Sequence, residues 1–325
     1  MERALYGPSG FFTTPGGGPA AHFRTSVHAS PLFTGALLRL LTWLDQALGA
    51  PPRLDVVDVG AGRGELLCAL AEAAPAQLRD RLRLVAVERA ARPPGLPAWL
   101  GWRADLPGPV TGLLVATEWL DNVPLDVASA DGAGVARYVL VDPASGAEKL
   151  GGQVSGVDAR WLARWWPLPS EPGARAEIGA PRDAAWASAV AAVRRGLALC
   201  VDYGHMVDRR PVFGTLTGFR AGRQVAPVPD GSCDLTAHVA VDALARPGSL
   251  LLAQRDALRA LGVHGQRPPL DLARHDPAGY LRALAAASAA AELTDLAGLG
   301  GHYWLAQPVG VVPPDAWQDV ARCRA

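Results

Sequence analysis

The sequence of 325 residues is poor in the residues that mark several classes of protein. It has four cysteines, and no pair has the spacing of metal ligands, so we expect no zinc site. Cys68 and Cys200 fall in apolar runs and are predicted to be small core residues. Neither sign of charge is in excess, because 31 Lys and Arg balance 31 Asp and Glu. There is therefore no global field to attract nucleic acid or an anionic membrane.

Long hydrophobic runs are also missing. No stretch has 18 consecutive apolar residues, and the N-terminus lacks a basic segment followed by an apolar one. We therefore expect a cytoplasmic protein with neither a membrane nor a nucleic-acid partner. Half of the residues are hydrophobic, as in soluble globular proteins, and the length favours one main domain with an insertion.

The strongest pattern is the stretch 54–67, LDVVDVGAGRGELL. Its first six residues are apolar except Asp55 and Asp58, which is typical of a parallel strand buried on both faces. Apolar residues at helical spacing follow it, so the intervening glycines lie where a strand turns into a helix. A side chain there would hold a ligand away from the backbone. These glycines are Gly60, Gly62 and Gly64.

The spacing of the glycines indicates the ligand. A dinucleotide fingerprint would have glycine at the position of Glu65. The pattern instead reads acid-x-Gly-x-Gly-x-Gly, with Asp58 as the acid, and resembles the first motif of class I S-adenosylmethionine (SAM) methyltransferases. Taken alone, the loop also fits a nucleotide site or a tight structural turn.

Acidic residues follow two further predicted strands. The strand 82–87 ends at Glu88, where a carboxylate can accept hydrogen bonds from both ribose hydroxyls, although a solvated strand end would look the same. The strand 113–117 ends at Glu118, with Asp121 shortly after it; both could instead cap loops. Because ligands sit beyond the carboxyl ends of parallel strands, Gly60, Glu88 and Glu118 are predicted to converge on one crevice.

Between these strands, residues 89–109 are predicted to form a helix and a short third strand. Asp105, in this segment, could reach the adenine amino group or face water. A fifth strand is predicted to end at Asp202. The predicted fold class is thus α/β, a doubly wound and mostly parallel sheet of the Rossmann-like type found in class I SAM methyltransferases, with an inserted subdomain and an N-terminal helical arm.

The predicted domain boundaries follow changes in pattern. Residues 1–52 form an arm and a helix, with Ser30 as N-cap and Pro31 at the first helical position; the core comprises 53–124 and 196–325, and the inserted subdomain 125–195. Its Trp161, Trp165 and Trp166 are predicted to pack in a core or a lid. Residues 205–233 look irregular and 234–244 look like a capped helix.

Several separated segments resemble one family, the MidA-type SAM-dependent methyltransferases, whose eukaryotic members are mitochondrial protein-arginine methyltransferases acting on a complex I subunit. The segments span nearly the whole chain in the family's order. Thr117 and His22 depart from the family's asparagine and aspartate. The resembling segments include LYGPSGFF, HFRTSVHASPLF, VVDVGAGRGELL, ATEWLDNVPLDV, ALCVDYGH, CDLTAHVAVDAL and LLAQRDALRALGV.

The resemblance implies SAM as cofactor and assigns a set of residues to its site. The family's Asp-Tyr-Gly falls on Asp202 to Gly204, and its Asp-Phe-x-Thr-Ser on 22–26. The expected cofactor-binding residues are Thr25, Ser26, Asp58, Gly60, Gly62, Gly64, Glu88, Asp105 and Glu118.

The expected activity is methyl transfer to a protein side chain, arginine by resemblance. A guanidinium stays protonated up to a pKa above about 12, so carboxylates would have to orient it and take its proton. Glu118, Asp121 and Asp202 are the predicted catalytic residues, and no metal is required. A protein substrate is expected, and a homodimer is compatible with the sequence. The alternatives are a non-catalytic SAM-binding assembly factor and a nucleotide-dependent oxidoreductase.

Overall fold

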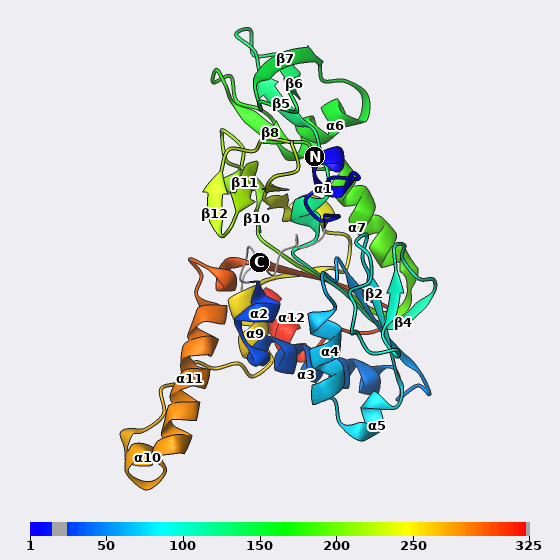
Figure 1. Ribbon diagram of the computed structural model, residues 1–325, viewed down its shortest axis with the longest axis vertical. Helices are drawn as coiled ribbons and strands as arrows, with labels where there is room; N and C mark the ends of the chain where they lie inside the picture. The colour runs from blue at the N-terminus through cyan, green and yellow to red at the C-terminus, as the bar shows by residue number, and fades with distance from the viewer. Residues whose placement is uncertain (15–24, 323–325) are drawn as a thin grey trace.

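The computed structural model describes residues 1–14 and 25–322, and a seven-stranded sheet lies at its centre (Figure 1). The strand order is β15-β16-β9-β4-β1-β2-β3. The strands from β3 to β9 run parallel, whereas β16 is antiparallel to both of its neighbours. The predicted α/β fold with a mostly parallel sheet is thus confirmed. The bounds are β1 Leu54–Val59, β2 Leu82–Val87, β3 Gly101–Arg103, β4 Val110–Thr117, β9 Val193–Asp202, β15 Leu250–Ala253 and β16 Tyr303–Val309.

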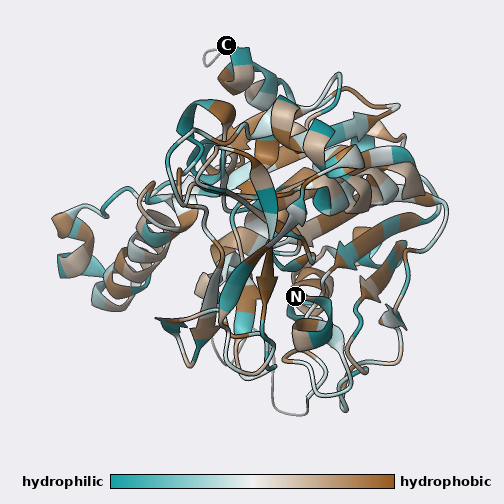
Figure 2. Cartoon of the chain, turned by 90° about the horizontal axis from the view of Figure 1, so that it is seen from above, coloured by the Kyte–Doolittle hydropathy of each residue, from teal (hydrophilic) through white to brown (hydrophobic). Residues whose placement is uncertain are grey.

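Helices cover both faces of this sheet. Leu54 and Val56 of β1 face one helical layer, whereas Val57 and Val59 face the other, as the alternation of a strand requires. Figure 2 shows the hydrophobic residues concentrated in these strands and in the helices beside them. The first layer comprises α3 Pro31–Ala47, α4 Glu65–Ala73, α9 Gln254–Ala260, α11 Pro277–Thr294 and α12 Asp315–Arg322; the second comprises α7 Ala180–Ala192 and α8 Val241–Leu244.

Two buried polar side chains stabilise these elements, one at the start of a helix and one inside a strand. Ser30 Oγ accepts a hydrogen bond from Leu32 N at 3.1 Å, and Pro31 is the first residue of α3, which confirms the predicted helix start. Asp55, inside β1, accepts hydrogen bonds from Arg83 Nε and Thr111 N at 2.8 and 2.9 Å. The carboxylate therefore links β1 to both neighbouring strands.

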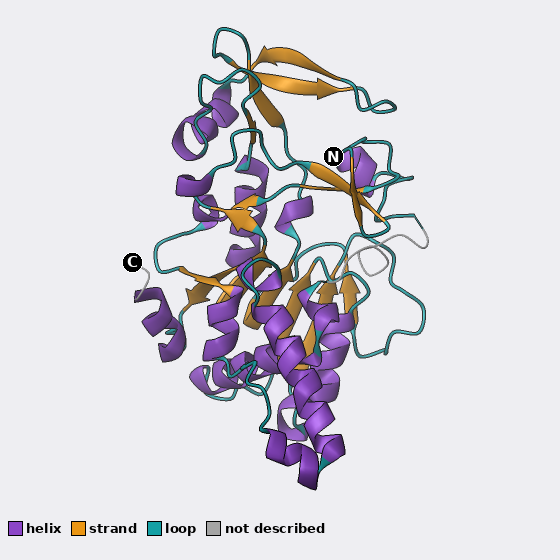
Figure 3. Ribbon diagram, turned by 90° about the vertical axis from the view of Figure 1, so that its left-hand side faces the viewer, coloured by secondary structure: helices purple, strands orange, loops and turns teal. Residues whose placement is uncertain are grey.

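A second sheet lies apart from the first, at the top of Figures 1 and 3. Its strands are antiparallel in the order β7-β6-β5-β8, and α6 packs against them. Trp161 and Trp166 are buried in this layer, in agreement with their predicted packing role. Trp161 Nε1 donates to Asp183 Oδ2 on α7 at 2.8 Å and so ties the layer to the main body. The bounds are β5 Val127–Ala130, β6 Ala136–Val141, β7 Glu148–Gln153, α6 Gly156–Trp165 and β8 Arg175–Glu177.

The segment 234–244 is not the predicted helix. It forms β13 Asp234–Thr236, β14 Val239–Ala240 and α8. Leu235 is buried against the N-terminal residues while Asp234 and Thr236 line a cavity, and this alternation requires a strand. The preceding stretch, predicted to be irregular, contains β10 Gly204–His205, β11 Thr217–Arg220 and β12 Arg223–Val225, and β11 pairs with both β12 and β13.

Helix α11 and the short α10 Leu270–His275 project from the body (Figures 1 and 3). Two further short helices, α1 Glu2–Tyr6 and α2 Ser26–Ala29, lie near the N-terminus, and α5 Ala76–Arg79 follows α4. None of the helices in the described part of the chain combines the length and the apolar character needed to span a membrane.

Candidate functional site

The turn between β1 and α4 is built on left-handed backbone. Gly60, Gly62 and Gly64 have φ of +74°, +56° and +82°. These values favour glycine, because a Cβ atom is disfavoured in that region. A Cβ on Gly62 would meet Glu65 Oε2 at 3.7 Å and otherwise extend into open space, whereas one on Gly64 would approach Leu100 Cδ2 to 3.0 Å. Gly62 therefore keeps a cavity open, and Gly64 allows close packing at the start of α4.

The cavity beside this turn has a volume of about 1180 Å³. It reaches from the glycine turn, past the tips of β2 and β4, to β11 and β13. Gly60, Glu88 and Glu118 all line it, so the three strand tips that the sequence predicted to converge do share one crevice.

The predicted site residues divide into two groups. Those that line the cavity are Thr25, Asp58, Gly60, Gly62, Glu88, Glu118 and Asp121. Ser26, Gly64, Asp105 and Asp202 are not in its lining; Asp105 is exposed and the other three are buried. The motif residues 22–24 lie outside the described residues, and the roles assigned to the whole set stay predictions.

Glu88 links the tips of β1 and β2. Its Oε2 accepts a hydrogen bond from Gly62 N at 3.0 Å, and its Oε1 accepts one from Ala90 N at 2.9 Å. Burial raises the pKa of Glu88, and the backbone donors oppose this rise. A carboxylate oxygen has two lone pairs, so each oxygen can accept one more hydrogen bond from a ligand.

Asp58, at the end of β1, is only 2% exposed. Its Oδ1 has no hydrogen-bond partner in the part of the chain that the structure describes, although the residue lines the cavity. Burial raises its pKa well above the usual value, and the charges of Glu88 and Glu65 add to the rise. A buried acceptor without a donor is costly, which marks this oxygen as a place for a ligand N–H.

Glu118 starts a compact turn after β4. Its backbone has φ of +50°, which is uncommon for a residue with a side chain, and Glu118 N donates to Val201 O at 2.8 Å. Oε1 of Glu118 faces Ser26 N at 3.4 Å. Burial and then the charge of Asp121 raise the pKa of Glu118 to about 8.

Asp202 stabilises this turn from the side that faces away from the cavity. It is fully buried, and its Oδ2 accepts hydrogen bonds from the backbone N of Leu120 and Asp121 at 3.0 and 3.3 Å. Its Oδ1 accepts one from Tyr203 N at 3.0 Å. Burial raises the pKa of Asp202 well above its usual value. The carboxylate therefore stabilises the 3-10 helix Leu120–Asn122 from outside the cavity lining.

Asp121 lies in that turn and faces the far half of the cavity. It is 3% exposed, and burial raises its pKa. The hydroxyls of Tyr203 and Thr236 both donate to its Oδ2, the latter at 2.7 Å. Asp121 Oδ1 has no hydrogen-bond partner among the described residues.

A buried guanidinium lies under the turn. Arg182 of α7 is 2% exposed and donates to the carbonyl oxygens of Asp121 at 2.5 Å and Val123 at 3.3 Å. It also donates to those of Ala237 and His238, both at 3.0 Å. Arg182 thereby joins the Asp121 turn to the segment after β13.

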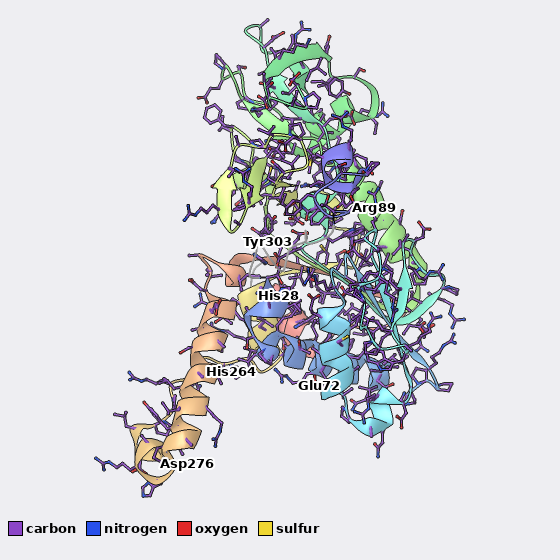
Figure 4. All side chains as sticks on the ribbon, viewed as in Figure 1. His28, Glu72, Arg89, His264, Asp276 and Tyr303 are labelled. Carbon is purple, nitrogen blue, oxygen red and sulfur yellow. The ribbon has the colours of Figure 1, made fainter. Side chains whose placement is uncertain are left out.

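The N-terminal residues close the cavity from another side. Tyr6 OH donates to Asn122 O at 3.3 Å, and the Arg89 guanidinium lies 4.1 Å from the centre of the Tyr6 ring and pairs with Glu2 at 2.5 Å. Figure 4 shows Arg89 beside α1. Phe12, Thr13 and Thr14, which follow α1, line the cavity.

Sequence reasoning missed several residues of the cavity. Thr236 and Asp234 were hidden in a predicted helix, and a period-2 pattern over three residues is too short to reveal β13. Tyr203 stood only as part of a family motif, although a tyrosine directly after a strand tip is a signal that could have been used.

The cavity is strongly acidic. The lining residues within the described ranges include six carboxylates and two arginines. Arg92 donates to the carbonyls of Leu96, Pro97 and Leu100, so its charge is committed to its own loop. The site therefore suits a cationic ligand. The carboxylates are Asp58, Glu65, Glu88, Glu118, Asp121 and Asp234.

Comparison with known proteins identifies a family and several similar solved structures. Residues 39–254, about two thirds of the chain, match the family described as "Putative S-adenosyl-L-methionine-dependent methyltransferase". A COG1565 superfamily member from Burkholderia thailandensis, crystallised with S-adenosyl-homocysteine (SAH), is 27% identical with a TM-score of 0.78 over 100% of this chain and 90% of its own. Another crystal structure of a COG1565 superfamily protein from that organism is 26% identical, with a TM-score of 0.74 over 97% of this chain and 88% of its own. No curated protein matches.

Proposed function

Because this chain belongs to the family of S-adenosyl-L-methionine-dependent methyltransferases, we propose that it transfers a methyl group from SAM to a protein side chain. The observation that carries the proposal is the convergence of Asp58, Glu88 and Glu118 on one acidic cavity beside a glycine turn. SAM has a net positive charge, because its sulfonium and ammonium groups outweigh its single carboxylate, and the lining has an excess of carboxylates over arginines. The fold class is shared with the SAH-bound protein.

The residues present fit SAM at three places. Asp58 Oδ1, which is buried and has no hydrogen-bond partner within residues 1–14 and 25–322, can accept from the ammonium group. Glu88 has a free lone pair on each oxygen for the two ribose hydroxyls. The segment 90–96 lines the cavity with Ala90, Pro93 and Leu96 and offers an apolar wall for the adenine ring. When bound, SAM supplies a methyl group on a sulfonium sulfur, which is a good leaving group.

The acceptor that we propose is an arginine side chain, as in the mitochondrial complex I assembly relatives that the sequence resembles. The acidic far half of the cavity supports a cationic acceptor. Glu118 and Asp121 would orient a guanidinium, and alignment of its nitrogen with the methyl group would supply most of the rate enhancement. Asp202 would act by holding the turn that carries both residues.

Calorimetry with SAM, SAH and NAD tests the cofactor assignment. We expect binding of SAM and SAH but not of NAD. Gly62→Arg should abolish SAH binding, because its side chain would enter the cavity from a residue with φ of +56°. Gly134→Arg is the matched control, since Gly134 has φ of +77°, has open space around it and lies in the turn between β5 and β6 of the second sheet.

Methyl transfer is tested separately, with labelled SAM and a cell extract. Label on an extract protein, absent with Asp121→Asn, supports the activity. SAH binding without any transfer would leave a non-catalytic SAM-binding protein, and binding of NAD in place of SAH would favour an oxidoreductase.

A further inference from the structure

We infer that Tyr203 and Thr236 are positioning residues that occupy one carboxylate oxygen of Asp121 and leave the other as the atom that binds an N–H group of the methyl acceptor. The inference rests on the proposed function and narrows it to acceptors that carry hydrogen on nitrogen. It concerns the far half of the cavity, away from the glycine turn.

The hydrogen bonds around Asp121 are asymmetric. Oδ2 accepts from two hydroxyls, those of Tyr203 and Thr236, and these two hydroxyls also contact each other. Oδ1 is buried and lacks a partner among the described residues, yet Asp121 lines the cavity. Because an unpaired buried acceptor is destabilising, this arrangement is expected where a ligand supplies the missing donor.

Hydrogen bonds hold the backbone of Asp121 at both its N–H group and its carbonyl oxygen. Asp202 accepts from Asp121 N, and Arg182 donates to Asp121 O. Asp202 also accepts from Tyr203 N, so one carboxylate fixes the backbone of both Asp121 and Tyr203. The Tyr203 ring also packs against His238 and His302, at 5.2 and 5.6 Å between ring centres. Rotation of the Asp121 carboxylate would break two hydrogen bonds at once.

A fixed acceptor oxygen selects for an N–H donor. A carboxylate, thioether or tertiary amine acceptor would leave Oδ1 unpaired, whereas a primary amine or a guanidinium pairs with it. A hydroxyl could also pair with Oδ1, but it lacks the positive charge that the carboxylates of the lining favour. In the transfer, the nitrogen lone pair forms the new N–C bond, the C–S bond breaks with its electron pair moving to sulfur, and the proton shed by nitrogen goes to Asp121 Oδ1.

The titratable and charged groups that face Asp121 come from five elements. Their effects enter any measurement of how binding at Asp121 depends on pH. They are Glu118 before the turn, Asp202 and Tyr203 at the end of β9, Arg182 of α7, Asp234 and His238 around β13, and Tyr6 of α1.

The test uses SAH-saturated protein and two monocationic probes, methylguanidine and tetramethylammonium, titrated by NMR. Methylguanidine donates N–H bonds and tetramethylammonium cannot. We expect methylguanidine to bind and to lose about tenfold in affinity in Asp121→Asn and roughly threefold in Tyr203→Phe or Thr236→Val. Thr236→Ser keeps the hydroxyl and should restore the affinity.

The controls separate positioning from folding and from cofactor binding. Tyr203→Phe should remain folded and keep its SAH affinity, although its melting temperature should fall because a hydrogen bond to a buried carboxylate is lost. Tyr138→Phe, which removes a tyrosine–carboxylate bond to Asp158 in the second sheet, should have no effect on methylguanidine. Because Tyr203 lowers the pKa of Asp121, the pH of half-maximal methylguanidine binding should rise in Tyr203→Phe.

Equal binding of the two probes, or unchanged methylguanidine affinity and pH midpoint in Tyr203→Phe, would overturn the inference while SAH binding left the proposed function standing. Failure of the wild-type protein to bind SAH would instead reject the proposed function itself.

Discussion

Gly62 N and Glu88 Oε2 are joined by a hydrogen bond of 3.0 Å, although 26 residues separate them in the chain. The bond links the glycine turn after β1 to the tip of β2, and the second oxygen of Glu88 binds Ala90 N on the other side. Glu88 therefore shapes both the turn and the loop that follow the two strands, in addition to any contact with a ligand.

Glu88→Gln should weaken SAH binding by roughly 10- to 100-fold, the size expected for hydrogen bonds to a charged group. Whichever way the amide is oriented, its NH₂ group faces one of the two backbone donors, so the loop has to rearrange. Calorimetry measures the effect. The matched control is Glu72→Gln, at an exposed carboxylate of α4 outside the cavity lining, where less than a twofold change is expected. Equal losses in both variants would contradict the role of Glu88.

The parts of the site that the sequence could predict lie on long apolar strands. Six consecutive buried residues in β1 leave a clear signal, and the position of Gly60 and Glu88 directly after such strands fixes where they meet. Asp58 was found in the same way, because it belongs to the motif around the turn. No comparable signal placed Asp105, since an acid in a loop looks alike whether it faces a ligand or water.

The parts that could not be predicted depend on pairing between distant segments. Strand β13 has three residues, and its partner β11 belongs to a stretch that reads as irregular, so Asp234 and Thr236 were assigned to a helix. Arg182 is on a helix where an arginine normally faces water. Its burial depends on carbonyls of residues 121–123 and 237–238, which no local pattern connects to α7.

Arg182→Met should lower the free energy of unfolding by about 3 kcal/mol or more, because four backbone carbonyls in two segments each lose a hydrogen bond from the guanidinium. Urea unfolding, followed by tryptophan fluorescence, measures the loss. Arg194→Met is the control: Arg194 is exposed and donates to the side chain of Thr111, so a change within about 0.5 kcal/mol is expected. An equal decrease in the free energy of unfolding for the two substitutions would show that the buried guanidinium stabilises the fold no more than an exposed one does.

The ligand-free protein should lose stability as the pH rises from about 6.5 to about 8. Below this range the buried His205 and His302, whose pKa values burial lowers to about 3 and about 4, act in the opposite direction. Burial, followed by the charge of Asp121, raises the pKa of both Glu118 and Asp234 to about 8. In the unfolded chain these acids ionise near their usual values, so between the two values the folded state binds more protons, and stability falls with pH until it levels off above 8.

A difference of one pKa unit corresponds to about 1.4 kcal/mol, and a domain of this size changes its melting temperature by about 2–4 °C per kcal/mol. We therefore expect a decrease of several degrees across this range, measured by calorimetric scans. Glu118→Gln should flatten the curve, whereas Glu72→Gln, at an exposed site on α4, should leave its slope unchanged. A melting temperature that rises between pH 6.5 and 8, or a slope that is the same in Glu118→Gln as in the wild-type protein, would contradict the raised pKa of Glu118.

Arg89 should control how firmly the N-terminal residues cover the cavity. Its guanidinium pairs with Glu2 and lies over the Tyr6 ring, and both contacts are partly exposed, so together they contribute about 1 kcal/mol. Arg89→Met removes both contacts without touching the packing of Leu5, which is fully buried. Local opening of residues 1–14 should then become roughly fivefold more frequent.

Limited proteolysis with chymotrypsin reports this opening, because the segment carries Tyr6, Phe11 and Phe12. Cleavage in Arg89→Met should be about fivefold faster than in the wild-type protein, since under mild conditions the rate follows the population of the open state. Arg209→Met is the matched control, because Arg209 is highly exposed and lies 3.9 Å from Asp208 on the surface. Since Phe12 to Thr14 line the cavity, SAH should slow cleavage in the wild-type protein, and equal rates with and without SAH would show that the segment does not respond to the ligand.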